Sequence, residues 1–512
     1  MGWLPFYRHC WAGISGSIEK DDPSPYSAAL RELREETTLT SPGSLEFIRT
    51  GKPYSFVDED LNREWTIHPF GFRLKTEAEG GQGEKGLQID WEHEGWQWHD
   101  PAHVSDTKEF GGVPHIADSL RRVWFEKVLG DGPGAILAEG LDRLKNDHES
   151  GARQLAGEAL SILRNVVAAL DRDEPAEIWW ANVRIAAWHI WKNGRESMGA
   201  AIMNVLLGAL RSIEETMRQH EEHPDSVHSL KWRDSVVESL ERLISLRATN
   251  SAGVVSAAFL DYLQSAFSAK SGTNAPLSIL TLSESSTIAQ CLQLVAQKAD
   301  LPIDLRILES RPLYEGVSLA GSVAQAWAAL DGEQRDVAKF KITIYTDASA
   351  AIAAEGVDIV LIGADRIASS GAVSNKTGSL PAVLSAKHVS PSAKTVVLGE
   401  SEKVAPPGDP REHVVEDNDP MQLVRAWEAG QNGERVRSAA TGLSAAVGRG
   451  LDRHQAGGLD GVAVQIRNVF FEWVPPDLID VYVTEFGVWR LEDIAKHSEN
   501  LGAEEQRLFK DL

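Results

Sequence analysis

The side chains best suited to chemistry first appear in the stretch RELREETTL, where Glu32, Glu35 and Glu36 stand at positions i, i+3 and i+4. On a helix this spacing places the three carboxylates on one face. Carboxylates so close repel one another, and a bound divalent cation reverses that repulsion. Oxygen ligands suit Mg²⁺ or Mn²⁺, and such an ion can bridge phosphates and activate water. The alternative is an exposed acidic helix face that binds nothing.

The surrounding pattern resembles the Nudix box, G-x5-E-x7-R-E-U-x-E-E-x-G-U with U aliphatic, whose family hydrolyses nucleoside diphosphates linked to another moiety. The lead-in WAGISGSIEKDDPSPYSAAL supplies Gly16, and the matching box residues are Arg31, Glu32, Leu33, Glu35, Glu36 and Leu39. The resemblance implies that Glu32, Glu35 and Glu36 bind the metal and that one of them is a candidate base. It also implies that Arg31 orients the cluster.

The box departs from the family pattern at several positions. The interval from Gly16 to Arg31 is one residue longer, and Pro23 stands where the first box glutamate belongs, so Asp21 or Asp22 would have to substitute. Thr38 stands in place of the last glycine. Because threonine does not reach positive φ as easily as glycine, this replacement disfavours the usual end of the helix. Fewer than 20 residues precede the box, so we expect this sheet to lack one or two strands and to present an unpaired edge.

A second group of polar residues follows the strand-like run VDIVLIGADRI. This run ends in Gly363 and Ala364, which places Asp365 at the carboxyl end of a buried strand, where ligands bind in parallel sheets. Asn375, Lys376 and the backbone around Gly378 could hold a phosphate near a helix start. The alternatives are a helix N-cap for Asp365 and a surface cation for Lys376.

Further along the same region, Arg311 in ESRPLYEG could supply a second, bidentate phosphate contact. Residues 135–490 resemble the family that joins the alpha, beta and delta subunits of translation initiation factor 2B with two sugar-phosphate isomerases. These isomerases act on methylthioribose-1-phosphate and ribose-1,5-bisphosphate. The motifs that carry this resemblance are GRESMGAAI, ILTLSESSTI, ILESRPLYEGVSLA, VDIVLIGADRIASSGAVSNKTGS and FFEWVPPDLIDVYVTEFG.

In the isomerases of this family a cysteine works with the aspartate that Asp365 matches. Ser283 stands at the cysteine position, and a serine without an evident base is a weaker acid or nucleophile than a thiol. Cys291 lies eight residues later, more than two helical turns away, and is a poor replacement. The resemblance therefore favours ligand binding by Arg311, Ser283, Asn375, Lys376 and Gly363 over turnover. It also implies a homodimer through the C-terminal domain.

The elements that must position these residues divide the chain into three regions. Residues 1–128 alternate short strand-like runs such as LEFIRTG and IHPFGFRL with turn-rich loops, and LQIDWEHEGWQWHDPAHV resembles a final Nudix strand and turn. Residues 135–272 have a helical period, so Trp179, Trp180, Trp188 and Trp191 suggest a buried helix face or an aromatic ligand box. Residues 276–512 predict a Rossmann-like α/β domain with a parallel sheet. An insertion over about 404–462 is expected to be mobile.

Composition narrows the function classes. A net charge of -24 opposes broad binding to nucleic acid, although a few cations can still hold one phosphate. No apolar run reaches the length of a membrane span, and two cysteines fit a reducing, cytoplasmic compartment.

We therefore expect a multidomain protein in which an α+β Nudix-type, Mg²⁺- or Mn²⁺-dependent hydrolase of a nucleoside diphosphate derivative precedes a domain that binds a phosphorylated sugar or nucleotide. The alternatives are a sugar-phosphate isomerase and a noncatalytic regulatory protein related to initiation factor 2B.

Overall fold

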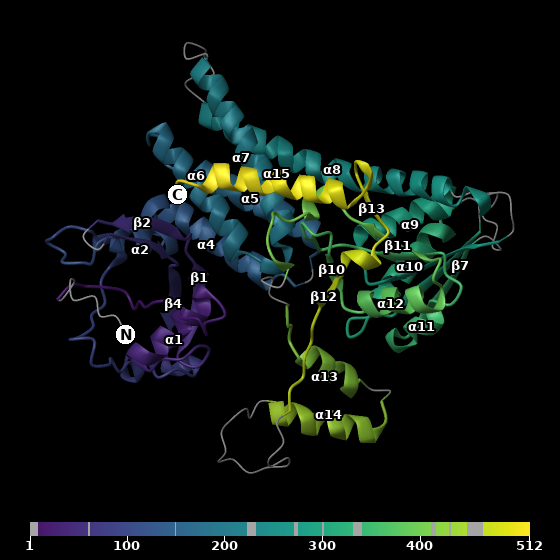
Figure 1. Ribbon diagram of the computed structural model, residues 1–512, viewed down its shortest axis with the longest axis horizontal. Coiled ribbons are helices and arrows are strands. Elements are labelled where there is room, and N and C mark those ends of the chain that lie inside the picture. Colours follow the sequence, from purple (N-terminus) through teal and green to yellow (C-terminus); the bar gives the residue numbers. More distant parts are fainter. Residues whose placement is uncertain are drawn as a thin grey trace.

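The computed structural model of the chain describes residues 9–59, 62–148, 150–222, 232–270, 275–298, 302–330, 340–410, 416–429, 432–447 and 464–512. Figure 1 shows an N-terminal α+β domain, a long helical region and a C-terminal α/β domain. None of the helices in these ranges has the length and apolar character that a membrane crossing requires.

The N-terminal domain contains two antiparallel pairs of strands, β1 with β4 and β2 with β3. Ahead of helix α1, the described residues 9–24 form one isolated bridge, between Trp11 and Gly112. The bounds are α1 (Pro25–Thr37), β1 (Leu45–Thr50), β2 (Tyr54–Asp58), β3 (Arg63–Ile67), β4 (Phe70–Leu74), α2 (Ile116–Val123) and α3 (Glu126–Leu129).

The core of this domain is thin. Within the described residues from 9 to 124, the buried apolar side chains are Ala28, Leu39, Leu45, Pro69 and Val104. Tyr26 of α1 adds an aromatic cluster, since its ring lies 5.1 Å from that of Phe47 and 6.1 Å from that of Phe72. A small core gives little stabilisation by itself, so contacts with the helical region contribute to holding α1 and its sheet.

The prediction of a final strand in LQIDWEHEGWQWHDPAHV is wrong. Residues 87–100 contain no strand, and a short 3-10 turn follows at Pro101–His103. The amides of Gln88 and Asp90 donate instead to the carbonyls of Thr37 and Glu36, at 3.1 Å each. The last carbonyls of a helix have no partner within it. By donating to these carbonyls at the end of α1, the amides of residues 88 and 90 keep this segment out of the sheet.

The helical region consists of long helices packed on one another. Three of its predicted core tryptophans are buried, with 1% of Trp179, 5% of Trp188 and 8% of Trp191 exposed, and Trp180 packs partly buried against them. This confirms a packed helix face and leaves no aromatic box. The helices are α4 (Asp131–Asn146), α5 (Ala152–Ala169), α6 (Ala176–Asn193), α7 (Gly199–Glu222) and α8 (Trp232–Ala266).

The C-terminal domain is built on a seven-stranded sheet with strand order β14-β13-β11-β8-β5-β6-β7, parallel except for β14. Alternate residues of β8 face different cores, Ile359 and Leu361 on one side and Val360 and Ile362 on the other. Apolar burial on both faces is typical of a parallel sheet covered by helices. The strands are β5 (Leu277–Leu282), β6 (Ile303–Leu308), β7 (Phe340–Tyr345), β8 (Ile359–Ile362), β11 (Lys394–Leu398), β13 (Val481–Thr484) and β14 (Gly487–Trp489).

Helices α8, α9 and α10 cover one face of this sheet, and α11 and α12 cover the other. A small antiparallel sheet of order β12-β10-β9 lies beside α12. The bounds are α9 (Ser286–Lys298), α10 (Glu315–Ala328), α11 (Ala350–Ala353), α12 (Ser379–Val389), α15 (Leu491–Phe509), β9 (Arg366–Ile367), β10 (Val373–Lys376) and β12 (Phe471–Val474).

The predicted insertion contains two helices, α13 (Met421–Glu428) and α14 (Glu434–Val447), which project from the body in Figure 1. The expectation that the insertion is mobile falls in part on residues 411–415, 430–431 and 448–463, which lie outside the described residues.

The N-terminal domain docks on the helical region through specific hydrogen bonds. Asn193 at the end of α6 accepts from the Thr50 amide at 2.7 Å and donates to the Thr50 carbonyl at 2.9 Å. Arg122 donates to the Leu512 carbonyl at 2.8 Å, and Figure 1 shows the end of α15 beside this domain. Strand β1 and helix α2 are therefore tied to the rest of the chain.

Candidate functional site

Helix α1 presents the predicted glutamates because both of its ends are defined by the sequence. Ser24 accepts a hydrogen bond from the Ser27 amide at 3.1 Å, and Pro25 occupies the first turn, where its missing N–H is not needed. At the other end Thr38 has φ 62° and ψ 0°, the left-handed conformation that usually falls to glycine. The helix thus ends where the box predicts, but with a β-branched residue in a strained position.

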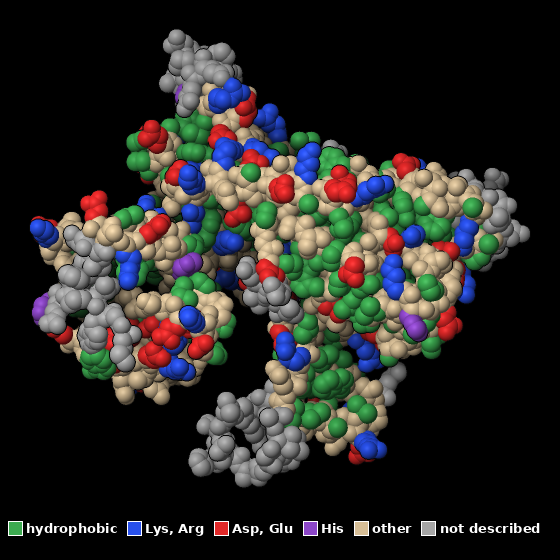
Figure 2. All heavy atoms as spheres, in the orientation of Figure 1, with side chains coloured by type: hydrophobic (Ala, Val, Ile, Leu, Met, Phe, Trp, Pro, Cys, Tyr) green, Lys and Arg blue, Asp and Glu red, His purple; other side chains and the backbone are tan. Residues whose placement is uncertain are grey.

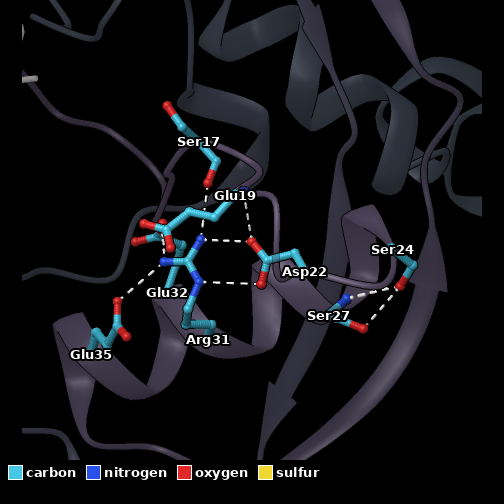
Figure 3. A network of polar contacts seen from close by, with 8 residues as sticks. All are labelled: Ser17, Glu19, Asp22, Ser24, Ser27, Arg31, Glu32 and Glu35. Carbon is cyan, nitrogen blue, oxygen red and sulfur yellow. Dashed lines mark hydrogen bonds and ion pairs between the residues drawn. The ribbon is translucent and has the colours of Figure 1, made fainter. Parts of the chain in front are cut away.

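Arg31 is the centre of a polar network around α1 (Figure 3). Its Nη1 donates to Glu32 Oε1 at 2.7 Å and to Glu35 Oε2 at 3.2 Å. Its Nη2 donates to Asp22 Oδ2 at 2.9 Å and to the Ser17 carbonyl at 2.9 Å. The hydrogen bond with Asp22, followed by that with Glu32, raises the pKa of the Arg31 guanidinium. Arg31 therefore orients Glu32 and Glu35, as the resemblance implies.

Asp22 is the acidic residue before α1 that pairs with Arg31. Besides the contact through Nη2, Arg31 Nε donates to Asp22 Oδ1 at 3.3 Å, so the pairing is bidentate. The hydrogen bond from Arg31, then that from the Glu19 amide, lowers the pKa of Asp22. Between the two aspartates that the sequence offers in place of a glutamate at Pro23, the structure selects Asp22.

Gly16 makes room for the Glu32 carboxylate. A Cβ at Gly16 would overlap Oε1 and Cδ of Glu32, so any larger residue there forces that carboxylate to move. Glycine at this position therefore leaves the Glu32 carboxylate where it is, and it does so without a special turn.

Glu36 faces away from Arg31. It is buried, with 7% of the residue exposed, and its Oε2 lies 2.7 Å from His93 Nε2. Burial raises the pKa of Glu36, and the hydrogen bond from His93 opposes that shift. His93 belongs to the segment that follows the end of α1, and its side chain was not predicted as part of the site. The EHE run around it is the only signal in the sequence.

The three glutamates do not meet at one point. Among the described residues, no group of three or more His, Cys, Asp or Glu side chains is arranged to hold a metal ion. The donors fit a hard dication in kind, since Glu32 and Glu35 already share one cationic nitrogen and Gly16 leaves a close-fitting cradle beside Glu32. Acidic side chains gather over α1 on the surface in Figure 2.

The C-terminal residues gather at the end of strand β8. Asp365 follows this strand, and its amide donates to the Ser374 carbonyl at 2.9 Å, which joins it to β10 and so to Asn375 and Lys376. Burial raises the pKa of the Asp365 carboxyl, while Lys403 and Lys376 oppose that shift. Oδ1 of Asn375 lies against Gly363, where an added Cβ would come within 3.2 Å.

Lys376 and Ser283 both contact a residue that the sequence did not single out. Lys376 Nζ lies 3.0 Å from Glu315 Oε1, and Ser283 donates from Oγ to Glu315 Oε2 at 3.4 Å. The Lys376 ammonium also lies over the Phe470 and Phe471 rings, at 4.5 and 5.2 Å from their centroids. Glu315 begins α10, and only its position after RPLY could have pointed to it.

Arg311 is held to its own loop. Its Nε donates to Glu309 Oε1 at 2.9 Å, its amide donates to Asp347 Oδ2 at 2.8 Å, and its side chain is 53% exposed. The structure therefore pairs Arg311 with Glu309 and Asp347 instead of grouping it with Asp365 and Lys376. Its phosphate contact remains a prediction.

Comparison with known proteins identifies both parts of the chain. The model of the initiation factor 2 subunit family matches residues 148–491. The chain belongs to this family. The NUDIX domain model matches residues 5–122, so this member of the initiation factor 2 subunit family also carries a NUDIX domain.

Two curated relatives are methylthioribose-1-phosphate isomerases. The chain is 28% identical over 198 residues to that of Magnetococcus marinus and 30% identical over 197 residues to that of Rhodopirellula baltica. Each match covers 38% of this chain and 45% of the relative, so the chain spans about half the length of these relatives.

Solved structures of similar fold include eIF2B beta from Chaetomium thermophilum, with 14% identity and a TM-score of 0.48 over 74% of this chain and 94% of that chain. Another is 5-methylthioribose 1-phosphate isomerase from Pyrococcus horikoshii, with 16% identity and a TM-score of 0.43 over 73% of this chain and 87% of that chain.

The second cysteine of this family member lies in the core. Cys291 in α9 has no exposed surface, its Sγ lies 3.5 Å from Ser256 Oγ, and burial raises its pKa to about 12. A thiol with this pKa remains protonated at neutral pH and does not act as a nucleophile. The structure thus agrees with the expectation that Cys291 does not replace the cysteine missing at Ser283.

Proposed function

We propose that the N-terminal domain hydrolyses a nucleoside diphosphate derivative with the help of Mg²⁺ or Mn²⁺. The observation that carries this proposal is the network in which Asp22 and Arg31 orient Glu32 and Glu35 on α1. A water would add to one phosphorus of the diphosphate, and the bond from that phosphorus to the bridging oxygen would break. The products are two monophosphates, one of them a nucleoside monophosphate.

In this proposal the residues of α1 have distinct tasks. Glu32 and Glu35 would hold the metal, and Glu36, the third predicted ligand, would join them once its carboxylate left His93. The metal would supply charge neutralisation at the phosphates and a more acidic water. Arg31 keeps Glu32 and Glu35 in place, and Asp22 fixes the guanidinium from the opposite side. Glu35 has the most exposed side chain of the pairs around Arg31, at 52%, so it is the residue that an incoming ligand reaches first.

The test is hydrolysis of a substrate panel that includes ADP-ribose, with Mg²⁺ or Mn²⁺. We expect a monophosphate product from the wild-type protein, a loss of roughly a hundredfold or more in Glu35→Gln, and no turnover after chelation by EDTA. Glu64→Gln on strand β3, an exposed position, removes the same charge away from α1 and should retain full activity. Absence of product from every substrate, with wild type and Glu35→Gln alike, refutes the hydrolase proposal.

We also propose that the C-terminal domain binds a phosphorylated sugar or nucleotide without isomerising it. The grouping of Asp365, Asn375 and Lys376 after strand β8 supports binding, and Ser283 at the cysteine position argues against turnover. Cleavage of a nucleoside diphosphate sugar by the first domain would release a sugar phosphate of this kind.

Calorimetric titration with ribose-5-phosphate tests the binding half, and Asp365→Asn should weaken it. Ketose formation from methylthioribose-1-phosphate or ribose-1,5-bisphosphate, abolished by Asp365→Asn, would instead establish an isomerase. No binding and no turnover would leave the regulatory alternative.

A further inference from the structure

Two of the predicted ligand-binding residues of the C-terminal domain, Lys376 and Ser283, are joined by a carboxylate of the protein itself. Glu315 places one oxygen 3.0 Å from Lys376 Nζ, and its other oxygen accepts from Ser283 Oγ at 3.4 Å. A carboxylate and a phosphate present similar anionic oxygens to a lysine and a hydroxyl. Glu315 thus makes the two contacts that an anionic group of a ligand would make.

The position of Glu315 is set by rigid backbone rather than by a mobile loop. Ser283, Ser310 and Tyr314 all have left-handed φ values, of 65°, 60° and 59°. The Ser283 amide donates to Ser310 Oγ at 2.8 Å, which ties the two turns together. Non-glycine residues keep this conformation only when their surroundings impose it.

The start of α10 is also pressed against strand β6. A Cβ at Gly316 would overlap the Leu308 carbonyl oxygen, and the Gly316 amide donates to the Glu309 carbonyl at 3.2 Å. The backbone of Glu315, the first residue of α10, is therefore fixed in front of Lys376, so a competing anion can displace only its side chain.

A second carboxylate occupies the start of α12. Glu472 Oε1 accepts from the Gly378 amide at 2.6 Å and from the Leu380 amide at 3.0 Å. These are the backbone groups that the sequence suggests for a phosphate. Glu472 reaches them because β12 pairs with β10, with Asn375 opposite Glu472.

Two further cations near Asp365 are paired as well. Lys403 Nζ lies 3.3 Å from Glu400 Oε2, and Arg195 Nη2 lies 2.7 Å from Glu416 Oε1. Both cations are buried, so water does not readily replace their carboxylate partners. An added phosphate would therefore meet lysine and arginine side chains that already have carboxylate partners.

We propose that Glu315, assisted by Glu472, occupies the anion position among the predicted ligand-binding residues of the C-terminal domain and sets their affinity for phosphorylated ligands, which bind only by displacing it. This inference rests on the second proposal above, that this domain binds a phosphorylated molecule, and it is independent of hydrolysis by the N-terminal domain. Glu315 is then a specificity-determining residue that favours ligands whose anionic group competes well with a carboxylate.

The test is calorimetric titration of the full chain with ribose-5-phosphate and, separately, with inorganic phosphate. Glu315→Gln keeps the size of the side chain and removes its charge, so we expect affinity for both probes to rise roughly tenfold, a factor that corresponds to about 1.4 kcal/mol. Glu472→Gln should give a smaller rise. Glu284→Gln, an exposed neighbour of Ser283, makes the same change in net charge and should match the wild type.

The melting temperature of each variant verifies folding, which we expect Glu315→Gln to retain because Lys376 keeps its contacts with the Phe470 and Phe471 rings. Equal affinities of the wild type and Glu315→Gln for ribose-5-phosphate overturn the role of Glu315 and leave the binding proposal intact. Absence of binding to the wild type and to every variant overturns both.

Discussion

Replacing Gly16 with alanine tests the arrangement around Arg31 most directly. The added Cβ would overlap the carboxylate of Glu32, while a Cβ at Gly13 in the same lead-in would have no atom within 4 Å. Gly16 does not have a positive φ, so alanine is compatible with the backbone. The cost falls on Glu32, whose carboxylate must swing away and give up its 2.7 Å hydrogen bond from Arg31 Nη1.

This displacement should damage activity much more than stability. Losing an ion pair near the surface costs at most about 1 kcal/mol, and the lower chain entropy of alanine in the unfolded state offsets about 0.4–1 kcal/mol of that. A misplacement of about 1 Å in a catalytic constellation can cost roughly a hundredfold in rate. We therefore expect kcat/KM of Gly16→Ala to fall by about 10- to 100-fold, with a free energy of unfolding within about 1 kcal/mol of the wild type.

The assay is hydrolysis of the best substrate of the panel with Mg²⁺, alongside urea denaturation of the same preparations. Gly13→Ala is the matched control and should behave as the wild type in both measurements. Full activity in Gly16→Ala would refute the reasoning, because Glu32 would then not need its observed position. A loss shared equally by Gly13→Ala would mean that the lead-in, and not Glu32, is sensitive.

Other substitutions test the domain junction and the end of α1. Burial, with a contribution from Arg49, lowers the pKa of His189 to about 3. The unfolded state therefore binds the extra proton between about pH 6.5 and 3, and stability should fall as pH drops through this window, by up to about 1.4 kcal/mol per pH unit. His189→Phe should flatten that slope in urea denaturation. Asn193→Ala removes both hydrogen bonds to Thr50 and should lower the free energy of unfolding by about 2–3 kcal/mol. Thr38→Gly relieves a left-handed residue that costs about 1–2 kcal/mol, less about 0.5–1 kcal/mol for glycine entropy, and should raise the melting temperature.

A control variant or a contradicting result is defined for each of these predictions. An unchanged acid slope in His189→Phe would assign acid sensitivity to other groups. Asn146→Ala, at an exposed position on α4, should lower the free energy of unfolding by less than about 0.5 kcal/mol. An equally small decrease in Asn193→Ala would mean that the hydrogen bonds to Thr50 do not stabilise the domain junction. Thr37→Gly, one residue earlier and inside α1, should destabilise the protein. If Thr38→Gly also destabilises it, the strain at Thr38 is not significant.

Much of this molecule follows from local patterns along the chain. The parallel sheet predicted for residues 276–512 is formed by β5, β6, β7, β8, β11 and β13, because apolar residues in short runs between helical stretches have few other ways to be buried. The box spacing likewise placed Arg31, Glu32 and Glu35 on one helix. Asp365 at a strand end followed from the same kind of local pattern, since Gly363 ends the strand.

The errors and omissions concern contacts between distant segments. The predicted strand after LQID is absent because its amides bind the end of α1 instead. Glu36 turns to His93, 57 residues away, and no local pattern reports which partner a buried carboxylate will find. Repulsion among three glutamates is relieved here by separate partners, Arg31 and His93.

The sequence alone determined the helix that carries the glutamates and the strand that ends before Asp365. Only the tertiary structure decided which groups face each other: Asp22 rather than Asp21 beside Arg31, Glu315 against Lys376, and Glu472 at the start of α12. The physical reason is that periodicity and capping act over a few residues, whereas charge pairing depends on where the folded chain brings segments together.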